Sequence, residues 1–422
     1  MAYNHHLNAK RLGQELELEA ADCVRHLSGW KSAIEEINTW PEYTPQPLCD
    51  LRNTAESVNV ASLFIKDESK RFGVELGSFK ALGAPYAVYK ILSNEVYSRT
   101  STRPSSAELR SGKYRDITQY VTVCVATDGN QGRGLAYGAK IFSCRCVDYI
   151  HNHVSEGRQN AMQELGAIVI RIDGKYEASV ERAKEDARMN DWHFVSSTSW
   201  SDFDHGIPQD VMNAYMVVVE ETLSMVPAVD KITHVFVCGG VGSIAAAVFL
   251  GFFRSFQDLQ LLDGDKGTAL PRFVVVEPEE TDCLLQSAKA GQMVSSGGSL
   301  RTLMAGLACR APSPAAWKIL SWLASDFIAV PDTFSIEGMR ELAFGATGDI
   351  PVICGESSAA SMGVILQSSR DGVLREKLGL NSDSQVVIFG LEGATDPKLY
   401  EKLVGKTPLE VFAAQDAFSV IS

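Results

Sequence analysis

The stretch Val121-Thr-Val-Cys-Val-Ala-Thr-Asp-Gly-Asn-Gln-Gly132 decides the fold of this 422-residue chain. Its first half is a run of apolar and β-branched residues typical of a buried strand, and its second half is a turn that contains glycine. A helical pattern follows over 133–140, so the segment predicts one βα unit. Because ligands of open α/β sheets bind beyond the carboxyl ends of the strands, this turn is a candidate site.

The same order of strand, turn and helix recurs on both sides of this unit. The patterns predict strands over 62–66, 145–150, 168–172, 193–195, 234–238, 272–277, 326–330 and 385–389. They predict helices over 79–92, 155–165, 176–190, 207–225 and 244–253, and an exposed loop over 100–116. Such alternation is typical of α/β proteins with parallel sheets flanked by helices. Since a single core rarely grows beyond about 250–300 residues, we expect two lobes.

The composition argues against several classes of protein. A formal net charge of −13 is unlike the basic balance of most nucleic-acid-binding proteins. Residues 1–14 hold no apolar signal sequence, and no run of ~18 apolar residues predicts a membrane span. Nine cysteines without a CxxC pair indicate reduced thiols, so we expect the cytoplasm as compartment. The sequence leaves open whether Cys283 and Cys309 approach each other.

In the first half of the chain, Lys80 and Asp128 are the candidate catalytic residues. Lys80 stands near the start of a predicted helix, where burial and the helix dipole would lower its pKa and favour a Schiff base. The alternative is a solvated lysine, as most lysines are. Asp128 would act as a general acid or base, or would only cap the helix. His151 and His153 have no third ligand nearby, so we expect no metal site.

The stretch Gly239-Gly-Val-Gly-Ser243 follows a predicted strand and opens a helix. Backbone N–H groups at such a turn bind phosphate together with the helix dipole. The pattern G-x-G-x-x-A also matches over 240–245, and Glu277 ends the next strand, so a nicotinamide-dependent oxidoreductase is a rival hypothesis. The spacing is long for that hypothesis, because the ribose-binding acid usually stands ~20 residues on. An ordinary structural turn is the third interpretation.

Taken together, these motifs resemble a known family. Its pattern is matched, in order, by Lys66-Asp-Glu-Ser69, Ser78-Phe-Lys80-Ala-Leu-Gly83, Ala126-Thr-Asp-Gly-Asn130 and Gly239-Gly-Val-Gly-Ser243. The family is that of the fold type II (tryptophan synthase β-like) pyridoxal-phosphate (PLP) enzymes. Within it the chain is most similar to the diaminopropionate ammonia-lyases. Signatures similar to theirs are Ala126 to Gly134, Thr302 to Cys309, Gly355-Glu-Ser357, Glu392-Gly393 and Thr395-Asp396.

The resemblance implies a two-domain fold and a role for each matched residue. Residues 1–83 and 206–422 would form the large PLP-binding domain, and residues 84–205 the small mobile domain. Lys80 would carry PLP as a Schiff base and move the α-proton, with Asp128 as a second acid or base. The cofactor would contact Asn130, Gly239, Gly240, Val241, Gly242, Ser243, Glu356 and Leu391. The substrate would contact Thr127, Asp128, Ser197, Ala305 and Gly306.

The implied reaction is elimination from a small amino acid, with 2,3-diaminopropionate converted to pyruvate and ammonia by a homodimer. The chain departs from the family pattern at three places. Gln131 replaces a histidine, Ser197 replaces an acid that would suit a charged β-amine, and Leu391 or Gly390 stands where a hydroxyl would face the pyridine nitrogen. A serine or threonine dehydratase, or β-replacement on another β-substituted amino acid in a biosynthetic pathway, is the alternative. A catalytically degenerate binding protein is the alternative from another class.

Overall fold

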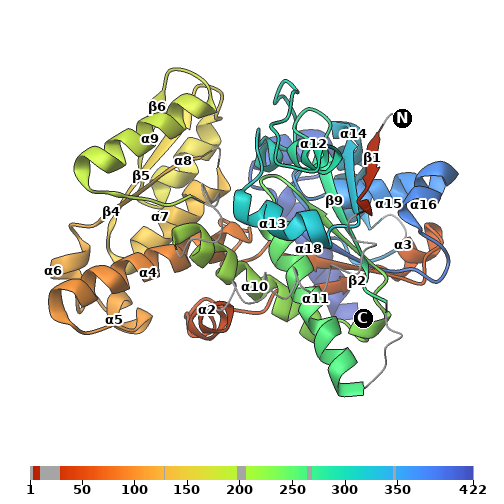
Figure 1. The fold of residues 1–422 in the computed structure, drawn as a ribbon, viewed down its shortest axis with the longest axis horizontal. Helices are drawn as coiled ribbons and strands as arrows, with labels where there is room; N and C mark the ends of the chain where they lie inside the picture. The colour runs from red at the N-terminus through yellow and green to blue at the C-terminus, as the bar shows by residue number, and fades with distance from the viewer. Residues whose placement is uncertain are drawn as a thin grey trace.

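The computed structural model describes residues 3–9, 29–127, 129–196, 206–263, 269–345 and 348–421. Mainly parallel strands flanked by helices form two separate sheets, one of seven strands and one of four. In Figure 1 the four-stranded sheet lies on the left and the larger sheet on the right. The α/β class predicted from the sequence is confirmed.

The larger sheet has the strand order β1-β10-β9-β8-β11-β3-β2. Its strands are β1 (Asn4–Leu7), β2 (Leu48–Asp50), β3 (Ser62–Asp67), β8 (His234–Cys238), β9 (Arg272–Pro278), β10 (Asp326–Val330) and β11 (Gln385–Gly390). The five central strands pair in parallel, whereas β1 and β2 pair antiparallel at the two edges. The sequence pattern predicts no strand before Ser62, because three or four residues are too few to show a periodic pattern.

The smaller sheet has the order β6-β5-β4-β7, and all its neighbours pair in parallel. Its strands are β4 (Thr122–Ala126), β5 (Arg145–His151), β6 (Ile168–Ile172) and β7 (His193–Phe194). Every residue of β4 is buried, as its continuous apolar run predicts for an inner parallel strand. Its carboxyl end leads directly into Thr127 and the candidate turn.

Helices cover both sheets and connect their strands. Those beside the smaller sheet are α4 (Lys80–Thr100), α5 (Ser106–Arg110), α6 (Arg115–Thr118), α7 (Asn130–Phe142), α8 (Glu156–Glu164) and α9 (Tyr176–Asn190). The others are α2 (Trp30–Ile37), α3 (Arg52–Ser57), α10 (Ile207–Met225), α11 (Ser243–Asp263), α12 (Cys283–Ala290), α13 (Pro314–Leu323), α14 (Asp332–Phe344), α15 (Ala360–Arg370), α16 (Gly372–Leu378), α17 (Pro397–Val404) and α18 (Pro408–Ile421), with the 3₁₀ helices η2 (Val229–Lys231) and η3 (Ala305–Leu307). Because α10 packs against both α4 and α11, it links the two sides of the molecule (Figure 1).

Some predicted elements differ from the observed ones. Helix α4 runs about two turns and α11 about three turns beyond the predicted end, and α7 begins at Asn130, inside the predicted turn. The predicted loop over 100–116 was wrong, because it contains α5 and the start of α6. A capping box between Ser105 and Glu108 starts α5. The polar composition of that stretch concealed this local signal.

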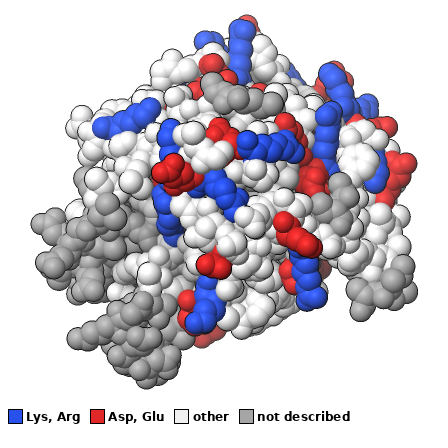
Figure 2. Space-filling model, turned by 90° about the vertical axis from the view of Figure 1, so that its right-hand side faces the viewer, with Lys and Arg blue, Asp and Glu red and all other residues white. Residues whose placement is uncertain are grey.

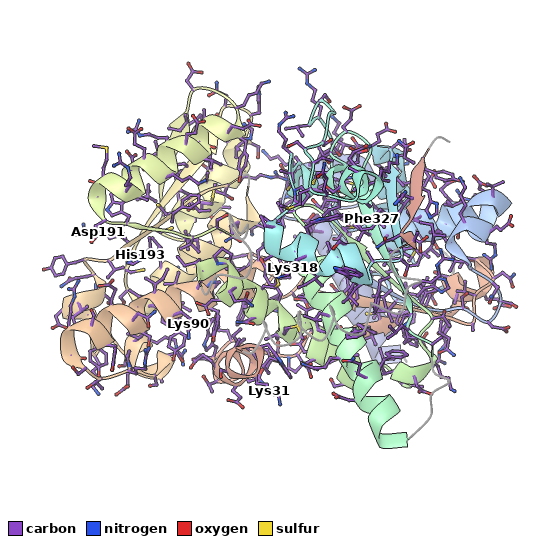
Figure 3. The ribbon with its side chains drawn as sticks, viewed as in Figure 1. Lys31, Lys90, Asp191, His193, Lys318 and Phe327 are labelled. Carbon is purple, nitrogen blue, oxygen red and sulfur yellow. The ribbon has the colours of Figure 1, made fainter. Side chains whose placement is uncertain are left out.

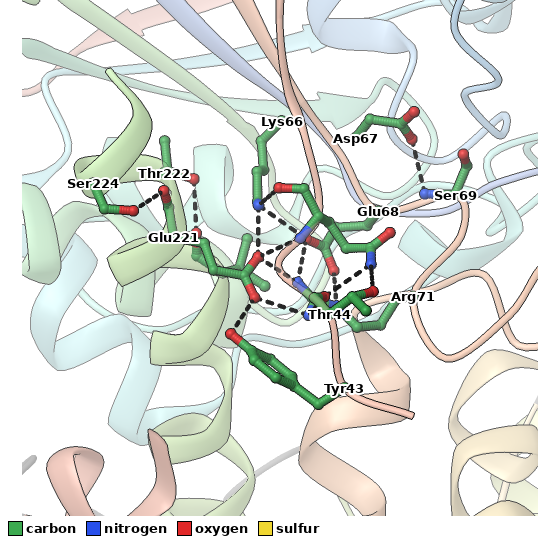
Figure 4. A network of polar contacts seen from close by, with 12 residues as sticks. Tyr43, Thr44, Lys66, Asp67, Glu68, Ser69, Arg71, Glu221, Thr222 and Ser224 are labelled. Atoms are coloured by element: carbon green, nitrogen blue, oxygen red, sulfur yellow. Dashed lines mark hydrogen bonds and ion pairs between the residues drawn. The ribbon is translucent and has the colours of Figure 1, made fainter. Parts of the chain in front are cut away.

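A buried ionic network ties the N-terminal segment to the larger sheet (Figure 4). The Glu221 carboxylate of α10 accepts hydrogen bonds from Lys66 Nζ at 2.6 Å and from Arg71 Nη2 at 2.7 Å. Arg71 Nε also pairs with Glu68 Oε2 at 2.8 Å, and the Tyr43 hydroxyl donates to Glu221 at 2.8 Å. Lys66 and Arg71 are buried together with Glu68 and Glu221. Each cation therefore needs its carboxylate partner to offset the cost of burying its charge.

The surface mixes both signs of charge. On the face shown in Figure 2, Lys and Arg side chains lie among Asp and Glu, without a continuous area of one sign in the coloured part. A cavity of about 470 Å³ lies between α4, β7 and the start of α10, and Lys90, His193 and Asp210 line it. Lys90 and His193 are labelled in Figure 3. Within the described ranges, no helix combines the length and the apolar character needed to cross a membrane.

Candidate active site

Lys80 is the first residue of α4, and aromatic rings surround its amine. Nζ lies 4.9 Å from the centre of the Phe79 ring and 5.7 Å from that of Tyr215. Burial lowers the pKa of Lys80 from 10.5 to about 8, although the nearby Cys309 and Glu392 oppose that shift. An amine with this pKa is partly neutral near physiological pH and is therefore nucleophilic.

The segment that directly follows β11 is hydrogen-bonded to the residues that precede α4. The Phe79 N–H donates to the carbonyl oxygen of Leu391 at 3.1 Å, and Ser78 forms an isolated bridge with Glu392. The Gly393 N–H donates to the carbonyl oxygen of Gly77 at 2.8 Å. The last strand of the chain therefore positions Lys80.

The turn after β4 is ordered by one hydroxyl and one amide. Thr127 Oγ1 accepts hydrogen bonds from the N–H groups of Gly129 at 3.0 Å and Gly132 at 3.1 Å. At the start of α7, Asn130 Nδ2 donates to Glu392 Oε2 at 2.6 Å. This contact brings the turn to the same place as Lys80. The predicted site residues Asp128 and Ser197 lie outside the described residues.

The glycine-rich turn between β8 and α11 leaves no room for side chains on its backbone. Gly240 and Gly242 have φ angles of +60° and +98°, the left-handed region that favours glycine. A Cβ added to Gly239 or Gly242 would lie within 2.9 Å of a leucine side chain. The carbonyl oxygen of Val241 accepts a hydrogen bond from the loop before α13, and Ser243 begins α11. The turn therefore presents backbone N–H groups at a helix N-terminus.

The segment around η3 joins the glycine-rich turn to the other parts of the site. The Gly306 N–H, next to Ala305, donates to Ser357 Oγ at 2.9 Å, and the Ser357 N–H donates to Glu392 Oε1 at 2.8 Å. A Cβ added to Gly240 would lie 3.4 Å from the Gly306 carbonyl oxygen and 3.8 Å from the Cys309 thiol. The same Cys309 opposes the lowering of the Lys80 pKa. The amine and the glycine-rich turn therefore face one region.

A family model described as pyridoxal-phosphate dependent enzyme matches residues 39–389 of this chain. The chain belongs to the pyridoxal-phosphate-dependent enzymes. Diaminopropionate ammonia-lyase of Escherichia coli (strain K12) is 34% identical over 366 residues, which cover 86% of this chain and 87% of that protein. The Salmonella typhimurium protein of the same name is 32% identical, over 86% of this chain and 89% of its own length.

Several solved structures share this fold. The crystal structure of the Escherichia coli lyase in complex with D-serine superposes with a TM-score of 0.80 at 30% identity, covering 96% of this chain and 97% of the other. Threonine deaminase isoform 2 of Solanum lycopersicum, at 17% identity and a TM-score of 0.63 over 89% and 88% of the two chains, shows the fold alone. The predicted fold type II is confirmed, and the nicotinamide hypothesis is wrong.

The residues around Lys80 fit PLP. A partly neutral lysine amine can form an imine with the aldehyde, and the glycine-rich turn suits the phosphate. Both polar atoms of the Gln131 carboxamide are buried without a hydrogen-bond partner, directly after Asn130. Buried polar groups are normally paired, so these atoms indicate a place for a polar ligand.

Glu356 and Leu391, two residues predicted to contact the cofactor, have different environments. The Glu356 carboxylate pairs with Arg158 at 3.1 Å. Burial and the charge of Glu392 raise its pKa to about 7, against the opposing charge of the arginine. The Leu391 side chain is buried in an apolar cluster that also contains Phe79. It offers no hydrogen bond to a ring nitrogen, so only its backbone takes part in the polar contacts of this region.

Other residues that the sequence singled out have structural roles. Glu277 accepts hydrogen bonds from the N–H groups of Leu284 and Leu285, at 2.9 and 2.8 Å, at the start of α12, which excludes the ribose-binding role. Asp396 accepts from the Leu399 N–H at 3.2 Å and caps α17. Cys283 and Cys309 are free thiols, and Cys283 Sγ donates to the carbonyl oxygen of Gly240 at 3.6 Å.

Sequence reasoning assigned no role to two residues of this region and only a general one to a third. Glu392 follows the last predicted strand and was expected to be within reach of a cofactor at the sheet edge, yet its contacts with Asn130 and Ser357 could not be foreseen. Cys309 ends a matched motif, but its effect on Lys80 depends on the fold. Tyr215 lies inside α10, where nothing distinguishes it from an ordinary core aromatic.

Proposed function

We propose that this chain is an ammonia-lyase that eliminates the β-amine of 2,3-diaminopropionate. The observation that carries the proposal is the Lys80 amine, with its pKa lowered to about 8, in a chain 34% identical to a diaminopropionate ammonia-lyase over 86% of its length. In the net reaction, one water is consumed and one pyruvate and two ammonia molecules are formed.

Each site residue has a task in this proposal. When bound, PLP supplies the sink for the electron pair that the α-carbon retains after losing its proton. Lys80 binds the cofactor through Nζ, and its amine later accepts the α-proton, for which a pKa near neutral pH is suitable. Glu392 orients the Asn130 side chain, which would donate to the 3-oxygen of the ring when the cofactor is bound. The turn at 239–243 would bind the phosphate at the N-terminus of α11.

The leaving amine requires a proton from another group. We assign that task to Asp128 as a second acid. Thr127, Ala305 and Gly306 line the substrate, and residues 84–205 move as a small domain against 1–83 with 206–422. Closure of that domain would exclude water until the β-substituent has left.

The test is to incubate the purified holoenzyme with 2,3-diaminopropionate, serine and threonine, and to measure 2-oxo acid and ammonia. Pyruvate from diaminopropionate at the highest kcat/KM supports the proposal. Lys80→Ala should abolish both the release of pyruvate and the visible absorbance band of the bound cofactor, whereas Lys140→Ala, at an exposed position of α7, should change neither. If none of the three amino acids yields a 2-oxo acid, simple elimination is rejected in favour of β-replacement. If no cofactor band forms either, the chain is a binding protein.

A hydroxyl leaving group is the second candidate. Ser197 stands where the related lyases have an acid suited to a charged β-amine, and the Escherichia coli lyase has been crystallised with D-serine. A higher kcat/KM for serine or threonine than for diaminopropionate would favour this dehydratase activity. Ser197→Asp should then shift the preference back toward the diamine.

We also propose that the protein works as a homodimer in the cytoplasm. The eight described cysteines are all free thiols, which suits a reducing compartment. The dimer is supported by the resemblance to the ammonia-lyase family. Analytical ultracentrifugation of the purified chain should give twice the monomer mass of 45.9 kDa, and a single monomer species would refute the dimer.

A further inference from the structure

The cavity of about 470 Å³ beside α4 and α10 is lined by polar side chains of both helices. These side chains are Lys90 and Asn94 of α4, and Gln209, Asp210 and Asn213 of α10. Residues three or four apart share a face of a helix, so each helix turns one polar face toward the cavity. Lys90 stands ten residues after Lys80 in α4, which corresponds to about 15 Å along the helix axis. The cavity is therefore separate from the candidate active site.

Two buried polar atoms in the wall of this cavity are unpaired. Within the part of the chain that the structure describes, Asn213 Oδ1 and Gln209 Nε2 form no hydrogen bond. Asn213 is only 4% exposed, so water does not replace the missing partner. Buried polar groups are normally paired, and a carboxamide oxygen accepts whereas a carboxamide nitrogen donates. One unpaired acceptor and one unpaired donor together indicate a ligand that offers both kinds of partner.

The charged groups of the cavity also carry both signs. Burial raises the pKa of Asp210 to about 6, and the charge of Lys90 opposes that shift, so both groups are mainly charged near pH 7. In another part of the wall, His193 Nε2 lies 3.5 Å from Glu95 Oε1. An ion of one sign would meet a like charge here, which disfavours its binding. A ligand with one positive and one negative end meets an opposite charge at each end.

We propose that this cavity is a second binding site, which takes a small zwitterionic amino acid. The ammonium group of the ligand donates to Asp210 and to Asn213 Oδ1, and its carboxylate accepts from Lys90 and Gln209 Nε2. The volume suits such a molecule, because small-molecule sites have about 300–1,000 Å³. The assignment goes beyond the proposed function, since no step at Lys80 requires a ligand in this cavity.

N,N-dimethylglycine is the probe for this site, because it is a zwitterion whose tertiary amine forms no imine with the cofactor. Isothermal titration calorimetry of the holoenzyme should show that it binds. Dimethylammonium and acetate, which each carry one of its charges, should bind at least about 10-fold more weakly. Asp210→Asn and Lys90→Met should each lower the affinity for the probe about 10–100-fold.

Asp383→Asn and Lys140→Met, both at exposed positions, are the matched controls and should leave the affinity for the probe unchanged. Three results would overturn the proposal: no binding of the probe up to about 10 mM, equal binding of either single ion, or an unchanged affinity in either cavity variant.

Competition separates this cavity from the site at Lys80. Alanine has a primary amine that binds the cofactor and shifts its absorbance, so a titration with alanine reports on the active site. At rising concentrations of N,N-dimethylglycine, the midpoint of that titration should stay constant or reach a plateau. A midpoint that rises in proportion to the probe would place the probe in the active site and overturn the proposal. If no cofactor band forms at all, the proposed function fails, yet calorimetry of the full chain still tests the cavity.

Urea unfolding separates ligand binding from a structural role of Asp210. Because its pKa is raised from 3.8 to about 6, the ionised carboxylate disfavours the folded state at pH 7. Without ligand, Asp210→Asn should therefore be at least as stable as the original protein. The probe should raise the urea midpoint of the original protein and leave that of Asp210→Asn unchanged. A marked loss of stability in Asp210→Asn without ligand would show a structural role and overturn the assignment.

Discussion

The depressed pKa of Lys80 predicts a pH-dependent gain of stability when the charge is removed. Lys80→Met keeps most of the side-chain volume and deletes the amine. The pKa is lowered from 10.5 to about 8, chiefly by burial. Because a pKa shift of one unit is worth about 1.4 kcal/mol, protonated Lys80 disfavours the folded state by about 3 kcal/mol.

The sign follows from proton binding. Below pH 8 both the folded and the unfolded chain carry the proton, so the penalty is complete. Between pH 8 and 10.5 the folded chain has lost the proton and the unfolded chain still holds it, so stability rises with pH. Lys80→Met without cofactor should therefore exceed the original protein by up to about 3 kcal/mol near pH 7, and the difference should vanish toward pH 10.5.

Urea unfolding from pH 6 to 10.5, monitored by tryptophan fluorescence, measures this difference. Lys140→Met, at an exposed position, is the matched control and should follow the curve of the original protein. In parallel, the rate at which the apo-protein reacts with PLP should rise with pH with a midpoint near 8. A Lys80→Met variant that is less stable at pH 7, or that differs from the original protein equally at every pH, would refute the reasoning.

Three further predictions concern stability. Glu221→Gln leaves the buried cations of Figure 4 without their shared carboxylate, so the free energy of unfolding in urea should fall by about 3–5 kcal/mol; a loss under about 1 kcal/mol would contradict the network. Gly242 has a φ of +98°, and a Cβ added there would lie 2.8 Å from Leu320, whereas Gly405 has a φ of +86° and open space around an added Cβ. Gly242→Ala should therefore lower the thermal unfolding temperature more than Gly405→Ala. Equal losses would rule out the steric cause. Burial raises the pKa of Asp148 from 3.8 to about 8, so the original protein should lose stability as pH rises through that range. Asp148→Asn should remove this slope and be more stable than the original protein at pH 8. Parallel curves of stability against pH would disprove this role of Asp148.

Local patterns were sufficient for most of the architecture. The apolar run at 121–126 and the eight other predicted strands lie within one or two residues of observed ones, because inner parallel strands are buried on both faces and need continuous apolar sequence. The edge strands β1 and β2 were missed because they are short, and β1 also pairs with a strand distant in the chain, β10. Helices α5 and α6 were missed because polar helices show little hydrophobic periodicity.

By itself, the sequence determined the α/β class, the PLP family, Lys80 as the candidate nucleophile and the glycine-rich turn, since each depends on a contiguous motif. Only the tertiary structure brought Glu392 to Asn130, 262 residues away along the chain. Likewise, only the fold revealed that the Lys80 amine lies near two aromatic rings and that two nitrogens of Arg133 have no hydrogen-bond partner. Burial and pairing are properties of the space around a side chain, and residues from distant parts of the chain fill that space.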